Sequence, residues 1–331
     1  MDLRKEPPLL EVDGLHVEFR TRDGVAKVLN GVDYHVDAGE TLAVLGESGS
    51  GKSVTANTVM GILASPPGVV TGGAVRYRGE ELLTAAPDRR RALRGENIAM
   101  IFQDALSALN PVFTVGFQIG EQLRMRRGMS RRDAEKRAVE LLDLVGIPGA
   151  KQRVRDHPHQ FSGGMRQRVM IAMSLALDPD VLIADEPTTA LDVTVQAQIM
   201  DLLAEIQAER HMALILITHD LGVVAEVADR IAVMYAGRIV ENADVHALYA
   251  NPCHPYTRAL LESIPRIDTK GSALRAIKGL PPSLTRIPPG CPFHPRCPMA
   301  ADVCSEVVPP LEVLPAGRSS ACLFAEELVS R

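Results

Sequence analysis

The chain has 331 residues, of which 46% are hydrophobic and 23% are charged, and its formal net charge at pH 7 is −5. This composition is typical of a globular protein with one large domain and an appendage, or with two modest domains, and it excludes a disordered chain. The negative net charge gives no electrostatic reason to expect a nucleic-acid partner.

The longest apolar stretches, residues 169–177 and 213–217, fall far below the roughly 20 residues that a membrane-spanning helix needs. Residues 1–10 carry mixed charges and two prolines and lack the apolar core of a signal peptide. We therefore expect a cytosolic protein that reaches a membrane only through its partners.

Stretches rich in Val, Ile and Leu alternate with longer amphipathic stretches, which is the order expected for a mainly parallel α/β sheet. The predicted strands are residues 41–45, 97–102, 181–184, 214–218 and 230–235. A helical subdomain is expected at about residues 104–175. Within it Ser130 and Asp133 resemble a capping box, and apolar residues then repeat at positions 138, 141, 142 and 145.

The composition and the periodicity of the chain change after residue 250. Prolines become frequent, helical periodicity weakens after Leu261, and four of the five cysteines lie in the last forty or so residues. We predict one domain at residues 1–250 and a C-terminal extension at residues 251–331.

The first motif that carries chemistry directly follows the strand at 41–45. It has the spacing of a phosphate-binding loop and leads into a helical stretch, 54–63, that begins with Val54. Its residues are Gly46, Glu47, Ser48, Gly49, Ser50, Gly51, Lys52 and Ser53. Backbone N–H groups at such a helix N-terminus bind phosphate, Lys52 reaches the β- and γ-phosphates of ATP, and Ser53 binds Mg²⁺. The alternative is a glycine-rich turn that binds nothing.

Polar side chains end three other predicted strands. Asp185 and Glu186 follow an apolar strand, where Asp185 suits the Mg²⁺ shell and Glu186 suits a base that acts on the attacking water. His219 closes another strand and can hold that water at the γ-phosphate. Gln103 follows the strand at 97–102 and can reach both metal and water. Taken alone, each is more often an ordinary loop or surface residue.

Ser162, Gly163 and Gly164 precede an amphipathic helix and form a second helix N-terminus that can receive phosphate. One nucleotide does not need two such cradles from a single chain. We therefore expect this segment to close over ATP that another subunit holds.

The extension contains Cys291, Cys297, Cys304 and Cys322, and Pro292 and Pro298 follow the first two. Four thiolates can hold a [4Fe-4S] cluster or a tetrahedral zinc ion, and free thiols are the third alternative. The intervals are wider than those of zinc knuckles, which favours the cluster. Cys253 is expected to be a packed thiol, and His294 to be a surface histidine.

Together these motifs resemble ABC ATPase domains in order and spacing over about residues 9–250. The resemblance implies a P-loop fold with a RecA-like, mainly parallel sheet, a helical subdomain and antiparallel N-terminal strands. By this resemblance residues 46–53 are Walker A, Asp185 and Glu186 close Walker B, residues 162–165 are the signature, Asp192 lies in the following loop and His219 is the switch histidine.

Two positions bear on this resemblance. Met165 stands where ABC ATPases most often have Gln. Phe19 falls near the place where the family stacks an aromatic ring on adenine, but Leu15, Val17 and Phe19 also alternate as a core strand does. Both interpretations of Phe19 stay open.

The motifs at residues 102–104, 109–111 and 157–160, and above all the segment 251–261, resemble the ATPase subunits of dipeptide and oligopeptide permeases. This likeness implies a second, related ATPase subunit in a heterodimer, two transmembrane permeases and an extracytoplasmic solute-binding protein at the bacterial inner membrane. The chain would lie on the cytoplasmic face and touch the membrane through the permeases. Members of the group also carry nickel, glutathione or sugars.

The resemblance further implies a [4Fe-4S] cluster in the extension. Its mechanism has two ATP molecules held between two ATPase subunits, with hydrolysis at Glu186 releasing them. The rival hypotheses are a soluble ABC ATPase that acts on DNA or ribosomes and a metal-sensing regulatory protein. Against the first, the chain has one cassette and no long coiled coil.

Overall fold

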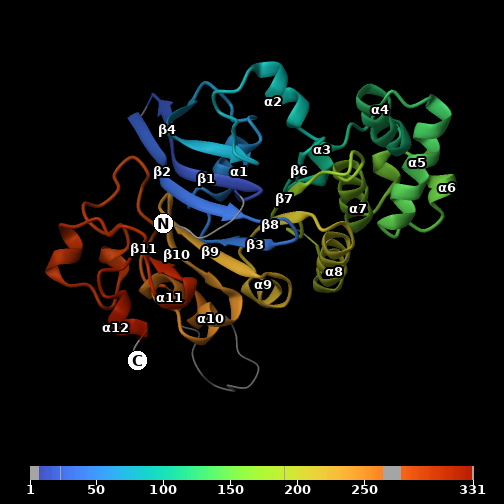
Figure 1. Ribbon diagram of the computed structural model, residues 1–331. Coiled ribbons are helices and arrows are strands. Elements are labelled where there is room, and N and C mark those ends of the chain that lie inside the picture. The colour runs from blue at the N-terminus through green and yellow to red at the C-terminus, as the bar shows by residue number, and fades with distance from the viewer. Residues whose placement is uncertain (1–6, 23, 190, 264–276, 330–331) are drawn as a thin grey trace. The chain divides into compact units, whose positions relative to one another are not determined.

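The computed structural model describes residues 7–22, 24–189, 191–263 and 277–329 (Figure 1). The described residues divide into two compact units. The first unit comprises Met1–Val36, Thr41–Leu83 and Thr218–Arg331, and the second comprises Asp37–Glu40 and Thr84–Ile217.

The first unit begins with an antiparallel sheet in the order β2-β1-β4-β5. Its strands are β1 (Leu10–Thr21), β2 (Gly24–Val36), β4 (Gly68–Tyr77) and β5 (Glu80–Glu81). In β1 the buried positions are Leu10 and Val12, then Leu15 and Val17. The register shifts between Val12 and Leu15, where Gly14 has a φ of 53°. This extra residue moves the buried face from even to odd positions.

The first unit also contains the strand run β11-β12-β10-β9-β3. Its members are β3 (Thr41–Leu45), β9 (Arg230–Tyr235), β10 (Arg238–Asp244), β11 (Glu312–Val313) and β12 (Ser319–Ser320). The strand β3 is parallel to β9, and β10 is antiparallel to both β9 and β12. The C-terminal extension therefore adds strands to the edge of β10.

Helices of the first unit are short. They are α1 (Lys52–Val59), α9 (Leu221–Val227), α10 (Val245–Ala250), α11 (Pro255–Glu262) and α12 (Ala325–Val329), with 3-10 helices at His294–Arg296, Asp302–Ser305 and Pro315–Gly317. The predicted helix 54–63 instead begins at Lys52, because Gly51 takes a left-handed conformation just before it. It ends at Val59, and Gly61 with a φ of 62° follows.

The second unit has three parallel strands, in the order β8-β7-β6, and most of the long helices. The strands are β6 (Ile98–Ile101), β7 (Val181–Asp185) and β8 (Ala213–Thr218). The helices are α2 (Pro87–Leu93), α3 (Ala105–Ala108), α4 (Val115–Arg127), α5 (Arg131–Leu144), α6 (Ala150–Arg153), α7 (Gly163–Ser174) and α8 (Val193–Arg210), with a 3-10 helix at Pro158–Gln160. Every residue of the three strands is buried, as expected of parallel strands.

The helical subdomain of the second unit gathers α4, α5 and α6 (Figure 1). Ser130 caps α5, and its Oγ accepts a 3.1 Å hydrogen bond from the backbone N–H of Asp133. The predicted apolar positions Ala138, Leu141 and Leu142 are buried. The α/β class, the parallel strands, the helical insert and the antiparallel N-terminal strands are thus confirmed.

Among the residues described, no helix is both long and apolar enough to span a membrane.

Candidate nucleotide-binding site

The predicted phosphate-binding loop leaves β3 and packs tightly against its neighbours. Gly46, Gly49 and Gly51 have φ values of 156°, 80° and 111°. A Cβ on Gly46 would lie 2.2 Å from the carbonyl oxygen of Met234, and one on Gly51 would lie 2.7 Å from Cδ2 of Leu29. The glycines are therefore required by close packing as well as by the left-handed turns at Gly49 and Gly51.

Lys52 lies inside this loop and is 5% exposed. Its Nζ donates hydrogen bonds to the carbonyl oxygens of Gly46 at 2.7 Å and Glu47 at 3.1 Å. Ser48 and Gly49 are exposed at the tip, whereas Ser53 and Val54 are half-buried in the first turn of α1. The ammonium group and the first turn of a helix thus lie in one loop, the arrangement that favours anions.

The base of the loop is tied to the neighbouring hairpin. The N–H of Gly237, between β9 and β10, donates to the carbonyl of Ser50 at 2.9 Å, and the N–H of Ser50 donates to the carbonyl of Glu47 at 3.2 Å. Ser50 itself is 5% exposed. The loop is therefore supported from the side away from its exposed tip.

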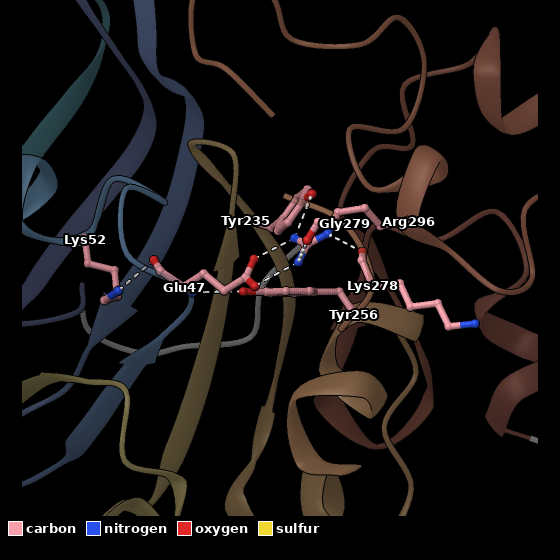
Figure 2. Close-up of polar contacts among 7 residues, drawn as sticks. All are labelled: Glu47, Lys52, Tyr235, Tyr256, Lys278, Gly279 and Arg296. Atoms are coloured by element: carbon pink, nitrogen blue, oxygen red, sulfur yellow. Dashed lines mark hydrogen bonds and ion pairs between the residues drawn. The ribbon is translucent and has the colours of Figure 1, made fainter. Parts of the chain in front are cut away.

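Glu47 contacts the C-terminal extension, which the sequence did not predict. Its N–H donates to Tyr256 Oη at 2.9 Å, and its carboxylate pairs with the Arg296 guanidinium at 2.6 and 2.9 Å. Figure 2 shows both side chains pointing toward Glu47 from the extension. The carboxylate raises the pKa of Arg296 further, because the hydrogen bonds favour the charged guanidinium.

Phe19 lies near the end of β1, opposite Ala26 of β2 and Gly68 of β4, and is half-buried. Leu15 and Val17 on the same strand are fully buried. The ring thus retains solvent exposure that the true core positions of β1 do not have.

In the second unit, Asp185 is the last residue of β7 and is 5% exposed. Glu186 follows with a φ of 47°, and its N–H donates to the carbonyl of Ile217 at 2.8 Å. A non-glycine residue in this conformation costs on the order of 1–3 kcal/mol, and such residues cluster at functional sites. The strained turn carries the Glu186 carboxylate out of the sheet.

The Glu186 carboxylate accepts hydrogen bonds from Gln103 and Thr189. Gln103 Nε2 and Thr189 Oγ1 each donate to Glu186 Oε2 at 3.0 Å. The structure therefore brings Gln103 and Glu186 into contact. Thr189 was missed, because a threonine in a loop has no distinctive sequence signal.

Ser162 is the N-cap of α7, and its Oγ accepts from the N–H of Met165 at 3.4 Å. Ser162 and Gly163 are exposed, so this helix N-terminus is open to a ligand. Asp192 is likewise exposed and caps α8, accepting from the N–H of Val195 at 3.0 Å. His219, which directly follows β8, is also exposed.

All four predicted metal-binding cysteines line one pocket of the extension. The pocket is bounded by Cys291, Cys297, Cys304 and Cys322 together with His254, Phe293, His294 and Met299. Burial raises the pKa of Cys322 to about 11, and it also raises the pKa values of Cys291 and Cys297. Cys253 does not line this pocket, but it belongs to a buried cluster with Leu314 and Ala325 against which Cys322 packs. It is fully buried, and burial raises its pKa to about 11.

The prediction of a metal centre at these cysteines is not supported by their placement. In the part of the chain that the structure describes, no group of three or more His, Cys, Asp or Glu side chains could hold a metal ion.

Two family models match the chain. The model described as ABC transporter matches residues 29–189, and the model described as Oligopeptide/dipeptide transporter, C-terminal region, matches residues 240–304. The first match includes the phosphate loop, Gln103, residues 162–164, Asp185 and Glu186. The second includes Tyr256, Arg296 and three of the four clustered cysteines.

Relatives of high identity cover almost the whole chain. The oligopeptide transport ATP-binding protein OppD of Salmonella typhimurium is 50% identical, over 97% of this chain and 95% of its own. The dipeptide transport ATP-binding protein DppD of Bacillus subtilis is 50% identical, over 91% and 90%. A putative peptide import ATP-binding protein of Brucella abortus is 48% identical, over 98% and 99%.

Among solved structures, a dimeric ATP-binding cassette in a post-hydrolysis state with ADP and Pi matches with a TM-score of 0.64 and 27% identity. It covers 71% of this chain and 98% of that one. The loop after β3, the acidic end of β7 and the two matched models agree with these likenesses. The chain therefore belongs to the ABC transporter family, among the ATP-binding proteins of oligopeptide and dipeptide transporters.

Proposed function

We propose that this chain is the ATP-hydrolysing subunit of an ABC importer for dipeptides or oligopeptides. The observation that carries the proposal is the combination of a phosphate-binding loop with an extension of the oligopeptide/dipeptide transporter type. Relatives with both parts, at about half identity over nearly the whole chain, are transport ATP-binding proteins for these substrates.

In this proposal the first unit binds the phosphates of ATP. Backbone N–H groups between Gly46 and Ser53 surround them, and Lys52 turns from its hydrogen bonds with the Gly46 and Glu47 carbonyls to the β- and γ-phosphates. The half-buried Phe19, on β1, retains an exposed ring surface on which the adenine stacks.

Glu186 acts as the base that activates water, and its carboxylate is oriented by Gln103 and Thr189. His219 forms a hydrogen bond with the γ-phosphate and holds the attacking water. Ser53, Asp185 and Gln103 carry hydroxyl, carboxylate and amide oxygens, which are the ligands that Mg²⁺ prefers. When bound, Mg²⁺ neutralises charge on the phosphates.

The exposed N-terminus of α7, with Ser162, Gly163 and Gly164, together with the Asp192 loop, meets the nucleotide of a second, homologous ATPase subunit. We propose a heterodimer of two such subunits beneath two transmembrane permeases, on the cytoplasmic face of the inner membrane, supplied by an extracytoplasmic solute-binding protein. The relatives named as dipeptide and oligopeptide transport proteins support this assembly.

The test is to co-express the chain with candidate permeases, a second ATPase subunit and a solute-binding protein from the same organism, and to measure ATP-dependent uptake into proteoliposomes. Uptake of a labelled dipeptide or oligopeptide that disappears in the Lys52→Ala variant is the expected result. Uptake of nickel, glutathione or a sugar in place of peptide would move the proposal to another solute. Co-purification of nucleic acid instead of permeases would refute it.

A [4Fe-4S] cluster in the extension is a second proposal; its starting point is that the four thiols line one pocket, although they do not form a metal-binding group in the described residues. A [4Fe-4S] cluster binds one thiolate at each of its four irons, and zinc held by the four thiolates is the alternative. Backbone N–H groups also point at these sulfurs, and the N–H of Met299 donates to Cys297 Sγ at 3.4 Å. Such hydrogen bonds stabilise thiolate ligands.

The cluster proposal is tested on the complex purified without chelator and under argon. Iron and acid-labile sulfide at about four each per chain, with a visible absorption band, are expected, and both should fall in the Cys304→Ser variant. Cys253→Ser is the matched control and should keep them. Zinc in place of iron, or a complex without metal, would contradict the proposal.

A further inference from the structure

Glu47 is the second residue of the phosphate-binding loop, and the extension binds both its backbone and its side chain. Tyr256 Oη accepts from the Glu47 N–H at 2.9 Å, and Arg296 pairs with the carboxylate through two hydrogen bonds of 2.6 and 2.9 Å (Figure 2). These partners lie 209 and 249 positions further along the chain. Two separate segments of the extension thus converge on one loop residue.

The guanidinium of Arg296 is also held in place by groups other than Glu47. Its Nε donates to the carbonyl of Lys278 at 3.1 Å, its Nη2 to the carbonyl of Gly279 at 3.3 Å, and its Nη1 to Tyr235 Oη at 3.3 Å. The side chain is 6% exposed. A buried, bidentate arginine held in this way loses little further freedom when it pairs, and its geometry is specific.

The hydroxyl of Tyr256 is fixed by aromatic packing. Its ring centroid lies 4.6 Å from that of Tyr235 and 5.3 Å from that of Phe293, and Tyr235 and Phe293 meet edge-on at 5.3 Å. All three side chains are almost completely buried. The acceptor of the Glu47 N–H is therefore part of a rigid cluster.

The carbonyl of Glu47 connects this contact to the phosphate lysine. It accepts from Lys52 Nζ at 3.1 Å and from the N–H of Ser50 at 3.2 Å. The extension binds Glu47 at its N–H and its carboxylate. The carbonyl of Glu47 in turn accepts the hydrogen bonds from Lys52 and Ser50 of the loop. A displacement of Glu47 therefore displaces the groups that receive phosphate.

We infer that Arg296 and Tyr256 are positioning residues for the nucleotide: they hold Glu47, and through it the loop and Lys52, in a preorganised conformation, so that nucleotide affinity depends on the C-terminal extension. The inference rests on the proposed function in one respect, that this loop binds nucleotide. An ordered loop binds more tightly than a mobile one, because the entropic cost of ordering is met before the ligand arrives.

The test is the dissociation constant of ADP, measured by calorimetry on the full chain, with KM and kcat for ATP in the assembled complex. Tyr256→Phe removes a single oxygen and should weaken ADP binding about fivefold, the value of one ordinary hydrogen bond. Arg296→Ala should weaken it about tenfold or more, since it leaves a carboxylate unpaired. KM should rise more than kcat falls, and Arg296→Lys should restore part of the affinity.

Arg286→Ala is the matched control, because Arg286 is an exposed arginine of the same extension. Its ADP affinity should equal that of the unaltered chain. A double-mutant cycle then isolates the ion pair: Glu47→Gln with Arg296→Ala should bind ADP no more weakly than Arg296→Ala alone. Additive losses would show that the two residues act separately and would contradict the inference.

The outcome can be separated from that of the proposed function by Lys52→Ala. If Lys52→Ala loses ADP while Tyr256→Phe and Arg296→Ala bind within twofold of the original, the positioning role is refuted and the nucleotide site stands. If Lys52→Ala also keeps its affinity, the phosphate-loop assignment itself fails. Should Arg296→Ala not fold, Tyr256→Phe decides alone.

Discussion

Gln103 donates a 3.0 Å hydrogen bond to the carboxylate of Glu186, although 83 positions separate them. Thr189 donates to the same oxygen at 3.0 Å. A carboxylate that accepts two hydrogen bonds on one oxygen is fixed in direction, as a base that acts on a positioned water molecule must be. This relationship supports the first prediction.

Glu186→Gln should keep ATP binding and lose most turnover. Glutamine retains an oxygen that can accept from Gln103 and Thr189, so the loop stays intact while the base is removed. The expected loss in kcat is about 10²- to 10⁴-fold, measured by phosphate release, with ATP holding the two subunits together in gel filtration. Glu135→Gln is the control, because the Glu135 side chain on α5 is 45% exposed. Fast turnover in Glu186→Gln would contradict the role assigned to Glu186.

Gly164→Ala and Gly163→Ala form a second, matched pair. A Cβ on Gly164 would lie 2.6 Å from Cγ1 of Val195, whereas one on Gly163 meets nothing closer than 3.8 Å. Valine is stiff at χ1 and cannot swing away cheaply. Gly164→Ala should therefore lower the free energy of unfolding by about 1–3 kcal/mol, while Gly163→Ala should leave it unchanged or higher.

Thermal and urea unfolding of the two glycine variants measures this difference. If both variants have the same stability, Val195 is not the obstacle. ATPase activity provides an independent measurement, because both positions belong to the helix N-terminus that we assign to a partner's nucleotide. Gly163→Ala should therefore lower activity without lowering stability.

A third prediction concerns Glu241 on β10, whose side chain binds residues of the C-terminal extension. Its side chain is completely buried and accepts from the N–H groups of Cys253 at 2.6 Å and His254 at 2.9 Å, with Arg318 at 3.5 Å. Burial raises the pKa of this carboxyl, and the hydrogen bonds oppose the rise. Glu241→Ala removes the carboxylate that pairs with the buried Arg318, which keeps its hydrogen bond to the Asn251 carbonyl, and leaves two N–H groups without this acceptor. This loss should cost about 3–5 kcal/mol.

Glu135→Ala supplies the contrast on the surface. Glu135 pairs with Arg155 at 3.2 Å, but the two side chains are 45% and 81% exposed. Such a pair contributes less than about 1 kcal/mol. Urea unfolding of both variants should therefore separate them clearly, and similar losses would argue that the Glu241 network carries little of the stability.

His254 should make the extension sensitive to acid. Burial lowers the pKa of His254 from 6.5 to about 3. Below pH 6.5 His254 binds a proton in the unfolded chain but stays neutral in the folded chain. The contribution of His254 to the free energy of unfolding is therefore unchanged above pH 6.5, and the free energy of unfolding falls as the pH drops toward 3. The slope from this residue approaches about 1.4 kcal/mol per pH unit.

The matched variant is His254→Asn. The Nδ1 of His254 accepts from the N–H of Tyr256 at 3.0 Å, and the asparagine oxygen can replace it at this N-cap. The unfolding free energies of the two proteins, measured between pH 7 and pH 4.5, should converge as the pH falls. Parallel curves would mean that His254 does not titrate in this way, and Glu241 beside it would be the next candidate.

Local signals in the sequence predicted much of the fold. The strands at 41–45 and 230–235 have the predicted bounds. The ends of β6, β7 and β8 lie within one residue of the predicted ends. Apolar runs of this kind specify buried parallel strands without help from distant residues. The cap at Ser130 was also predicted, because a side chain and a backbone three residues away determine it.

Long-range contacts were not predictable in the same way. Nothing around Arg296, in a segment rich in proline and without helical periodicity, indicates a partner 249 residues earlier. The hydrogen bond from the Glu186 N–H to the Ile217 carbonyl likewise joins residues that are far apart in the sequence. The roles of the site residues, and the metal in the extension, stay predictions that the experiments above test.

The pairing of β12 with β10 has a consequence for handling the protein. Ser320 and Ser319 lie opposite Glu241 and Asn242 and cover the backbone of β10 on the side away from β9. A fragment that ended at residue 250 would leave that backbone bare, and open strand edges recruit other chains. Loss of the extension should therefore cause aggregation, in addition to the weaker nucleotide binding expected when Tyr256 and Arg296 are removed.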